Sequence, residues 1–204
     1  MAKSLLIVSS SKGLNYANAL RNALKERFKE RRFSIECEVW NDMGVFPGTA
    51  STLGGLMKKA ESLSKENGYA VAMMTPDDAV SIENSGKAYW ISRDNVLFEY
   101  GLFMGKLGRK HVFAVKPNGK AFWFLSDLSG ITVAHYDYTA DNPPIHEAQK
   151  KLLEASLKIA EWIAPLETEP SSTPESPPPS PEPESPSTPE IPPSFTPLPP
   201  YPLM

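Results

Sequence analysis

One carboxylate stands alone in an apolar stretch of the sequence. Glu99 is the only charged residue in segment 96–105, and the residues three and four places further on are Leu102 and Phe103. Burying a carboxylate on such a helical surface is costly unless the group is paired or used in binding or catalysis. Glu99 is therefore a candidate catalytic residue. The structural alternatives are an exposed helix edge or a buried ion pair with Arg93.

The elements that must position Glu99 follow from the hydrophobic pattern. Continuous apolar runs at residues 5–8, 69–74 and 112–115 predict strands that are buried on both faces. Residues 33–40 and 131–136 alternate apolar and polar side chains, which predicts half-exposed strands. Four helices are predicted. The first has an apolar face of Ala17, Leu20, Leu24 and Phe28, and the second, after a cap at Thr49 or Ser51, has a face of Leu53, Leu56, Met57, Ala60 and Leu63. The third runs from residue 94 or 95 to 107 and is ended by Gly108, and the fourth runs from residue 143 to about 163.

Strands that alternate with helices predict an α/β fold with a parallel sheet. The fully apolar strands belong at the centre and the alternating strands at the edges, so the expected strand order is 2-1-3-4-5, a flavodoxin-like arrangement. Ligands of such sheets bind at the carboxyl ends of the strands. The segments at those ends are Ser9–Ser11, Trp40–Phe46 and Thr75–Asp78, whereas residues 79–92 are predicted to form a polar loop.

Composition divides the chain into two parts. Residues 170–204 hold 15 of the 21 prolines and no lysine or arginine, so we expect a domain at 1–165 and a disordered Pro/Ser/Glu-rich tail at 166–204. The net charge of −3 argues against direct nucleic-acid binding. The single cysteine fits a reducing compartment, and no apolar run approaches a membrane span, so we expect a cytoplasmic protein without membrane association. The apolar end of the tail is a hypothetical docking motif for a partner protein.

Two segments carry a family resemblance. Thr75-Pro76-Asp77-Asp78 and the later string N-V-x-F-E-x-G-x-F-x-G-x-L-G-R, which ends at Arg109, resemble the bacterial TIR-like predicted nucleotide-binding family. That family supplies TIR effectors of anti-phage defence, including those fused to STING in CBASS, and the resemblance extends from about Lys3 to Tyr138. It implies that Glu99 is the catalytic residue of an NADase that works by self-association, as a homo-oligomer or filament. It also implies a nucleotide cleft lined by Ser9, Ser10, Ser11, Trp40, Phe46, Asp78, Arg93 and Asn95.

The implied chemistry suits a lone carboxylate. Glycosidases usually need two carboxyl groups because an alkoxide leaving group must be protonated. Nicotinamide leaves NAD+ as a neutral base, so one carboxylate that stabilises the developing cation, or holds the ribose hydroxyls, is sufficient. NAD+ is then the substrate, and no cofactor is expected. Hydrolysis to ADP-ribose, cyclisation to a cyclic ADP-ribose, a non-catalytic nucleotide-binding scaffold and a deoxyribosyltransferase-like activity remain alternatives.

Other candidate features are weaker. Backbone amides of segment 9–13 could hold a phosphate at a helix start, although the spacing is not that of a P-loop. For Asp77 and Asp78, a role in a turn or helix cap is favoured over a metal site. The three histidines show no ligand spacing, so no metal site is expected. Gly101 and Gly105 lie on one side of the predicted helix and would allow close backbone approach.

Overall fold

The computed structural model describes residues 3–42, 52–81, 88–119, 121–124 and 133–168. The predicted cap residues Thr49 and Ser51 and the predicted cleft residue Phe46 lie outside this part of the chain. The described helices include none that is both long and apolar enough to cross a membrane.

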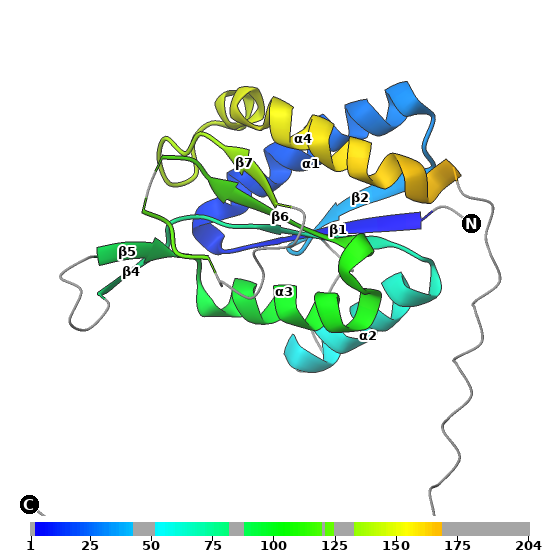
Figure 1. Ribbon diagram of the computed structural model, residues 1–204, viewed down its shortest axis with the longest axis horizontal. Coiled ribbons are helices and arrows are strands. Elements are labelled where there is room, and N and C mark those ends of the chain that lie inside the picture. Colours follow the sequence, from blue (N-terminus) through cyan, green and yellow to red (C-terminus); the bar gives the residue numbers. More distant parts are fainter. Residues whose placement is uncertain (1–2, 43–51, 82–87, 120, 125–132, 169–204) are drawn as a thin grey trace, which may run out of the picture. The chain divides into compact units, whose positions relative to one another are not determined.

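A five-stranded parallel sheet forms the centre of the domain (Figure 1). The order is β2-β1-β3-β6-β7, which confirms the predicted flavodoxin-like order, because β6 and β7 are the fourth and fifth strands of the prediction. The register pairs Leu5 with Cys37 on one side and with Tyr69 on the other. The strands are β1 (Lys3–Ser9), β2 (Ile35–Val39), β3 (Tyr69–Met73), β6 (Val112–Pro117) and β7 (Val133–Tyr136).

Two helices cover each face of the sheet (Figure 1). On one face lie α1 (Leu14–Arg31) and α4 (Ile145–Thr168), and on the other lie α2 (Thr52–Lys65) and α3 (Asp94–Leu107). Short 3₁₀ turns, η1 (Ser11–Gly13) and η2 (Arg109–His111), precede α1 and β6. The last helix runs to Thr168 instead of ending near residue 163, and it keeps Pro165 within its final turns.

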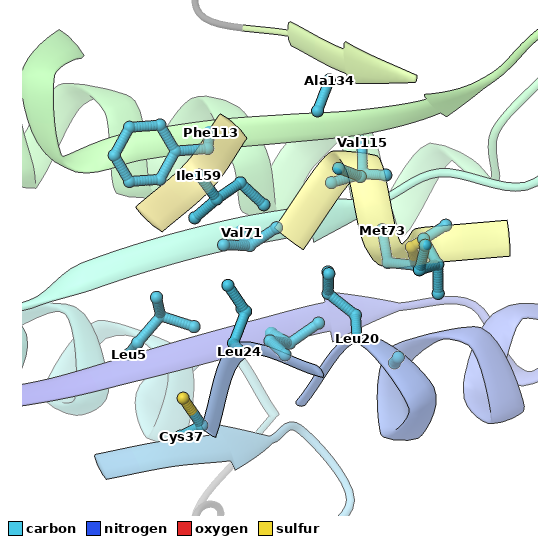
Figure 2. Close-up of a cluster of buried hydrophobic side chains, with 14 of the residues drawn as sticks. Leu5, Leu20, Leu24, Cys37, Val71, Met73, Phe113, Val115, Ala134 and Ile159 are labelled. Atoms are coloured by element: carbon cyan, nitrogen blue, oxygen red, sulfur yellow. The ribbon is translucent and has the colours of Figure 1, made fainter. Parts of the chain in front are cut away.

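The continuous apolar strands are explained by the two layers that they face. Successive side chains of a strand point to opposite faces, so Leu5 packs in the α1–α4 layer while Leu6 packs in the α2–α3 layer. Figure 2 shows the first layer, where strand side chains such as Val71 and Phe113 meet Leu24 of α1 and Ile159 of α4. Buried apolar side chains fill both faces of the sheet, and this leaves the carboxyl ends of the strands as the place for polar side chains.

The prediction of a polar loop over residues 79–92 was wrong at 79–81 and 88–91, and its middle part, 82–87, lies outside the described residues. An antiparallel pair, β4 (Asp78–Ser81) and β5 (Ala88–Ile91), lies beside the start of α3 (Figure 1). Trp90 extends the pair through backbone hydrogen bonds with Ala121 and Trp123. Each strand has only four residues and alternates exposed with partly buried positions. The signal of period two is too short there to be recognised without the tertiary partner.

Candidate functional site

Glu99 lies at the edge of the buried face of α3. Val96 and Phe103, three residues before and four after, are buried, whereas Phe98 is 56% exposed. The Glu99 carboxyl is partly buried, and loss of hydration raises its pKa to about 7. The alternative of an ion pair with Arg93 is wrong, because the Arg93 guanidinium instead pairs with Asp78, with 3.2 Å between Nε and Oδ2.

A buried carboxylate joins the ends of three elements near the start of α3. Asp77, which is 4% exposed, accepts hydrogen bonds at Oδ1 from the hydroxyls of Ser10 (2.7 Å) and Thr75 (3.0 Å). At Oδ2 it accepts a hydrogen bond from the backbone N–H of Arg93 (2.9 Å). We call these four residues the Asp77 network. It links the end of β1, the end of β3 and the residue that precedes α3.

The predicted serines differ in what their hydroxyls contact. Ser9 Oγ accepts a hydrogen bond from the indole Nε1 of Trp40 at 3.0 Å, which ties the end of β1 to the residue after β2. Ser10 belongs to the Asp77 network, and its Oγ also accepts from the backbone N–H of Gly13 at 3.2 Å. Ser11 is exposed. Ser9 and Ser10 are both buried, and the hydroxyl of each makes at least one contact within the domain.

The turn that begins α1 is held by Asn142. Its Nδ2 donates to the carbonyl of Ser11 (2.9 Å), its Oδ1 accepts from the backbone N–H of Asn15 (3.1 Å), and its own N–H donates to the carbonyl of Lys12 (3.1 Å). The amides of Gly13 and Asn15 are therefore paired within the domain. A phosphate at this helix start would have to compete with Ser10 and Asn142 for those two amides.

The remaining predicted residues lie at the surface around the start of α3. Asp78 and Arg93 are each 46% exposed at their side chains and form the ion pair described above. Asn95 is exposed in the first turn of α3. Arg93, and not Asp94 or Asn95, is the residue that precedes the helix, and its side chain makes no capping hydrogen bond. The acceptor that its N–H needs is supplied by Asp77, from the segment between β3 and β4.

The structure brings five of the predicted residues into two sets of contacts, whereas Glu99, Ser11 and Asn95 make no hydrogen bond or ion pair with these five within the described part of the chain. Ser9 contacts Trp40, and Ser10, Arg93 and Asp78 meet around Asp77. Thr75 and Asn142 were not predicted as site residues, and Asp77 was predicted only to have a role in a turn or cap. A signal was available for Asp77, because a carboxylate that directly follows a buried strand and a Thr-Pro pair lies at a ligand-binding edge.

Two further expectations concern the surroundings of the site. The described residues include no group of three histidine, cysteine or acidic side chains that could hold a metal ion. No described atom outside the helix's own backbone and the adjacent residues lies within 4 Å of a Cβ built on Gly101 or Gly105, so close backbone approach at these glycines is not seen within the described domain.

Comparison with known families identifies the domain. The family described as "CAP12/Pycsar effector protein, TIR domain" matches residues 5–138, from β1 to just beyond β7. This chain belongs to that family. The matched part of the TIR domain contains the Asp77 network, Trp40 and Glu99, whereas Asn142 and α4 follow it.

Curated relatives of this TIR domain come from several bacteria. The chain is 33% identical over 135 residues to a Pycsar effector protein of Pseudomonas aeruginosa, which covers 66% of this chain and 40% of that protein. It is 32% identical over 164 residues to a Pycsar effector protein of Burkholderia cepacia, covering 80% and 48%. It is 32% identical over 139 residues to CD-NTase-associated protein 12 of Flavobacterium daejeonense, covering 68% and 40%. The chain therefore matches less than half the length of each of these relatives.

Among solved structures, a diflavin flavoprotein A3 of Nostoc sp. aligns with this TIR domain at a TM-score of 0.40 and 13% identity, covering 80% of this chain and 95% of that chain. The score is too low to add to the fold argument.

Proposed function

We propose that this TIR domain cleaves the bond between ribose and nicotinamide in NAD+, with Glu99 as the catalytic carboxylate. The observation that carries the proposal is the setting of Glu99. It is a partly desolvated carboxyl, with a pKa raised to about 7, on a helix whose amino end is fixed at the carboxyl edge of the sheet. Groups with perturbed pKa values beside a ligand-binding edge are characteristic of catalytic sites.

The chemistry needs a negative charge beside the ribose and little else. As the bond to nicotinamide breaks, positive charge moves from the pyridinium ring to the ribose, and a carboxylate in a partly dry setting stabilises it more than water would. Nicotinamide leaves as a neutral base, so no general acid is required. The cationic ring of bound NAD+ would also favour the ionised form of Glu99 and lower its pKa from the value in the free domain.

The nucleotide would lie along the carboxyl ends of the strands. In this proposal Ser9, Ser11, Trp40, Asp78, Arg93 and Asn95 line the cleft, together with Phe46 from the segment that the structure does not describe. Arg93 and Asp78 present polar groups at the surface beside α3. The indole of Trp40, which is partly buried and held through its Nε1 by Ser9, offers a rigid aromatic edge for the nucleotide.

The names of the relatives suggest the biological setting. Pycsar effector proteins and CD-NTase-associated protein 12 are its curated relatives, so we infer a role in bacterial anti-phage defence within the cytoplasm. Depletion of NAD+ by an effector must be held in check until infection, and we infer control by self-association. Cyclisation of the ADP-ribose product is the alternative outcome of the same bond cleavage.

The test is turnover of NAD+ by the purified 204-residue chain, with and without a molecular crowder that promotes self-association. Nicotinamide and the ribosyl product are separated by chromatography and identified by mass, which distinguishes ADP-ribose from a cyclic product. Glu99→Gln should reduce nicotinamide release at least ~100-fold, whereas Glu161→Gln, at an exposed position of α4, should leave it unchanged. Equal release by wild type and Glu99→Gln would refute the assignment.

A further inference from the structure

We propose that Asp77 is a positioning residue, which holds the amino end of α3 and thereby fixes the position of Glu99 in the second turn of that helix. The inference rests on the proposed role of Glu99 and deepens it by assigning a second residue to the same site. It also assigns Ser10 a role in the Asp77 network in place of the predicted contact with the substrate.

The helix needs an acceptor at this end. The first N–H groups of a helix have no partner within the helix, and the residue before α3, Arg93, provides no side-chain cap. Asp77 Oδ2 accepts the N–H of Arg93 at 2.9 Å, and the negative charge lies where the helix dipole is positive. Within the first turn, Asp94 Oδ1 accepts the N–H of Asn95 at 2.8 Å. Asp77, from the segment between β3 and β4, supplies the acceptor for the N–H of Arg93.

The carboxylate is itself held on every side. The Asp77 N–H donates to the carbonyl of Ile91 at 3.0 Å, and the Asp77 carbonyl accepts from Lys12 Nζ at 3.0 Å. Its Oδ1 accepts from the hydroxyls of Ser10 and Thr75. The backbone of Asp77 is thus held by β5 and its Oδ1 by the residues that follow β1 and β3, and the remaining oxygen, Oδ2, accepts the N–H of the residue before α3.

Glu99 depends on that starting point. It lies six residues after Arg93, about 9 Å along a rigid helix, with buried Val96 between them on the face that packs on the sheet. A rotation of α3 about its axis would move Glu99 from the edge of the buried face, because neighbouring positions differ by about 100° around the axis. Small displacements of a reacting group cost large factors in rate.

The hydrogen bonds of Ser10 support this assignment. A hydroxyl has one proton and two lone pairs. The proton of Ser10 points to Asp77 Oδ1 at 2.7 Å, one lone pair accepts from the N–H of Gly13, and Thr75 Oγ1 lies at 3.0 Å. With the side chain 8% exposed, little capacity is left for a substrate. Ser10 therefore orients Asp77.

The experiment compares Asp77→Asn and Ser10→Ala with wild type in the full 204-residue chain. Asparagine keeps the size of the side chain but has one acceptor oxygen in place of two, so either the hydroxyls or the Arg93 N–H lose their partner. Ser10→Ala removes the contacts of the hydroxyl with Asp77, Thr75 and the N–H of Gly13 without changing charge. The matched control is Glu167→Gln, because Glu167 is also a carboxylate bonded twice, to Lys3 and Tyr69, but at the other end of the domain, where β1 and β3 begin.

Three measurements are made: amide hydrogen exchange of residues 93–99 by mass spectrometry, kcat and KM for NAD+, and the titration of the Glu99 carboxyl by NMR. We expect Asp77→Asn to speed exchange in 93–99 and to lower kcat ~10- to 100-fold with KM changed less than about threefold. Ser10→Ala should change the exchange rate in 93–99 and kcat in the same directions by smaller amounts. Glu167→Gln should change neither, even where its stability loss is similar.

Unchanged exchange in 93–99 for both Asp77→Asn and Ser10→Ala would overturn the proposal, as would faster exchange with kcat unchanged. If Asp77→Asn does not fold, Ser10→Ala decides. If wild type does not cleave NAD+, the proposed function fails, but the positioning role is still decided by exchange and by the Glu99 titration. If the positioning role is correct, the midpoint of the Glu99 titration moves toward 4.5 in Ser10→Ala, a substitution that leaves the charge of the chain unchanged. If the role is wrong, the midpoint stays in place.

Discussion

Asp77 Oδ2 accepts a hydrogen bond from the backbone N–H of Arg93 across 2.9 Å, and this contact joins the end of β3 to the residue that opens α3. It connects two segments of the resemblance to the TIR-like family, Thr75–Asp78 and the string that contains Glu99. The buried carboxylate of Asp77 therefore contacts the amino end of the helix that carries the partly buried Glu99 six residues later.

Glu99→Gln should make the domain more stable at high pH. The Glu99 pKa is about 7 in the folded domain and about 4.5 when it is unfolded. The folded state therefore holds the proton more tightly, and stability falls as pH rises from 4.5 through 7. Above pH 7 the variant should exceed wild type by about 1–2 kcal/mol, allowing for solvent screening of a partly buried group.

Denaturant unfolding at pH 4.5 and pH 8 measures this difference, which should vanish at the lower pH. Glu161→Gln is the control, because Glu161 is exposed on α4 and should change stability little at either pH. A Glu99→Gln variant that is less stable than wild type at pH 8 would show that the charged carboxylate stabilises the fold.

The pH dependence of NAD+ cleavage should also follow the ionisation of Glu99, but activity should rise over the pH range in which the stability of the wild type falls. Catalysis needs the ionised carboxylate, so kcat/KM should rise with pH through about 7 and stand at about a tenth of its plateau at pH 6. The midpoint for kcat should lie lower, because bound NAD+ places a cation beside Glu99. Initial rates from pH 5.5 to 9 test this, with circular dichroism to confirm folding, and a flat profile of kcat/KM would contradict it.

Asn142 should be sensitive to backbone conformation as well as to side-chain loss. Its φ is +43°, a left-handed value that glycine adopts readily and alanine does not. Asn142→Gly removes the side-chain bonds to Ser11 and Asn15, and Asn142→Ala also strains the backbone. Denaturant unfolding should show the alanine variant about 1 kcal/mol less stable than the glycine variant. Equal stability would mean that the φ of residue 142 relaxes at no cost.

Two glycines should respond oppositely to alanine. A Cβ on Gly68 would lie 2.6 Å from the carbonyl oxygen of Ser4, so Gly68→Ala should cost about 1–3 kcal/mol. Gly101 is exposed within α3 and meets no described atom within 4 Å, so Gly101→Ala should stabilise the chain by about 0.5–1 kcal/mol. Thermal unfolding measures both. A destabilised Gly101→Ala variant would instead indicate that a further surface packs on α3.

Much of the fold could be predicted because its signals are local. The apolar runs around Leu5, Val71 and Val115 indicated central strands since each faces two helical layers, and the order of strands followed. The hairpin of β4 and β5 was missed, because each of its strands has only four residues and the segment around Trp90 is completed by a distant partner, Ala121–Trp123.

In the candidate site, too, some features could be predicted from the sequence and others could not. The sequence by itself determined that Glu99 is the only charge in an apolar stretch of helix, because helical spacing depends only on near neighbours, but it left a pair with Arg93 open until the structure placed Arg93 against Asp78. Only the tertiary structure decided which residues hold the beginning of the helix that carries Glu99. Ser10 and Asp77 are 67 positions apart, and Asp77 and Arg93 are 16 apart. Their hydrogen bonds exist because parallel strands bring their carboxyl ends to one edge, and no local pattern records which donor will meet which acceptor there.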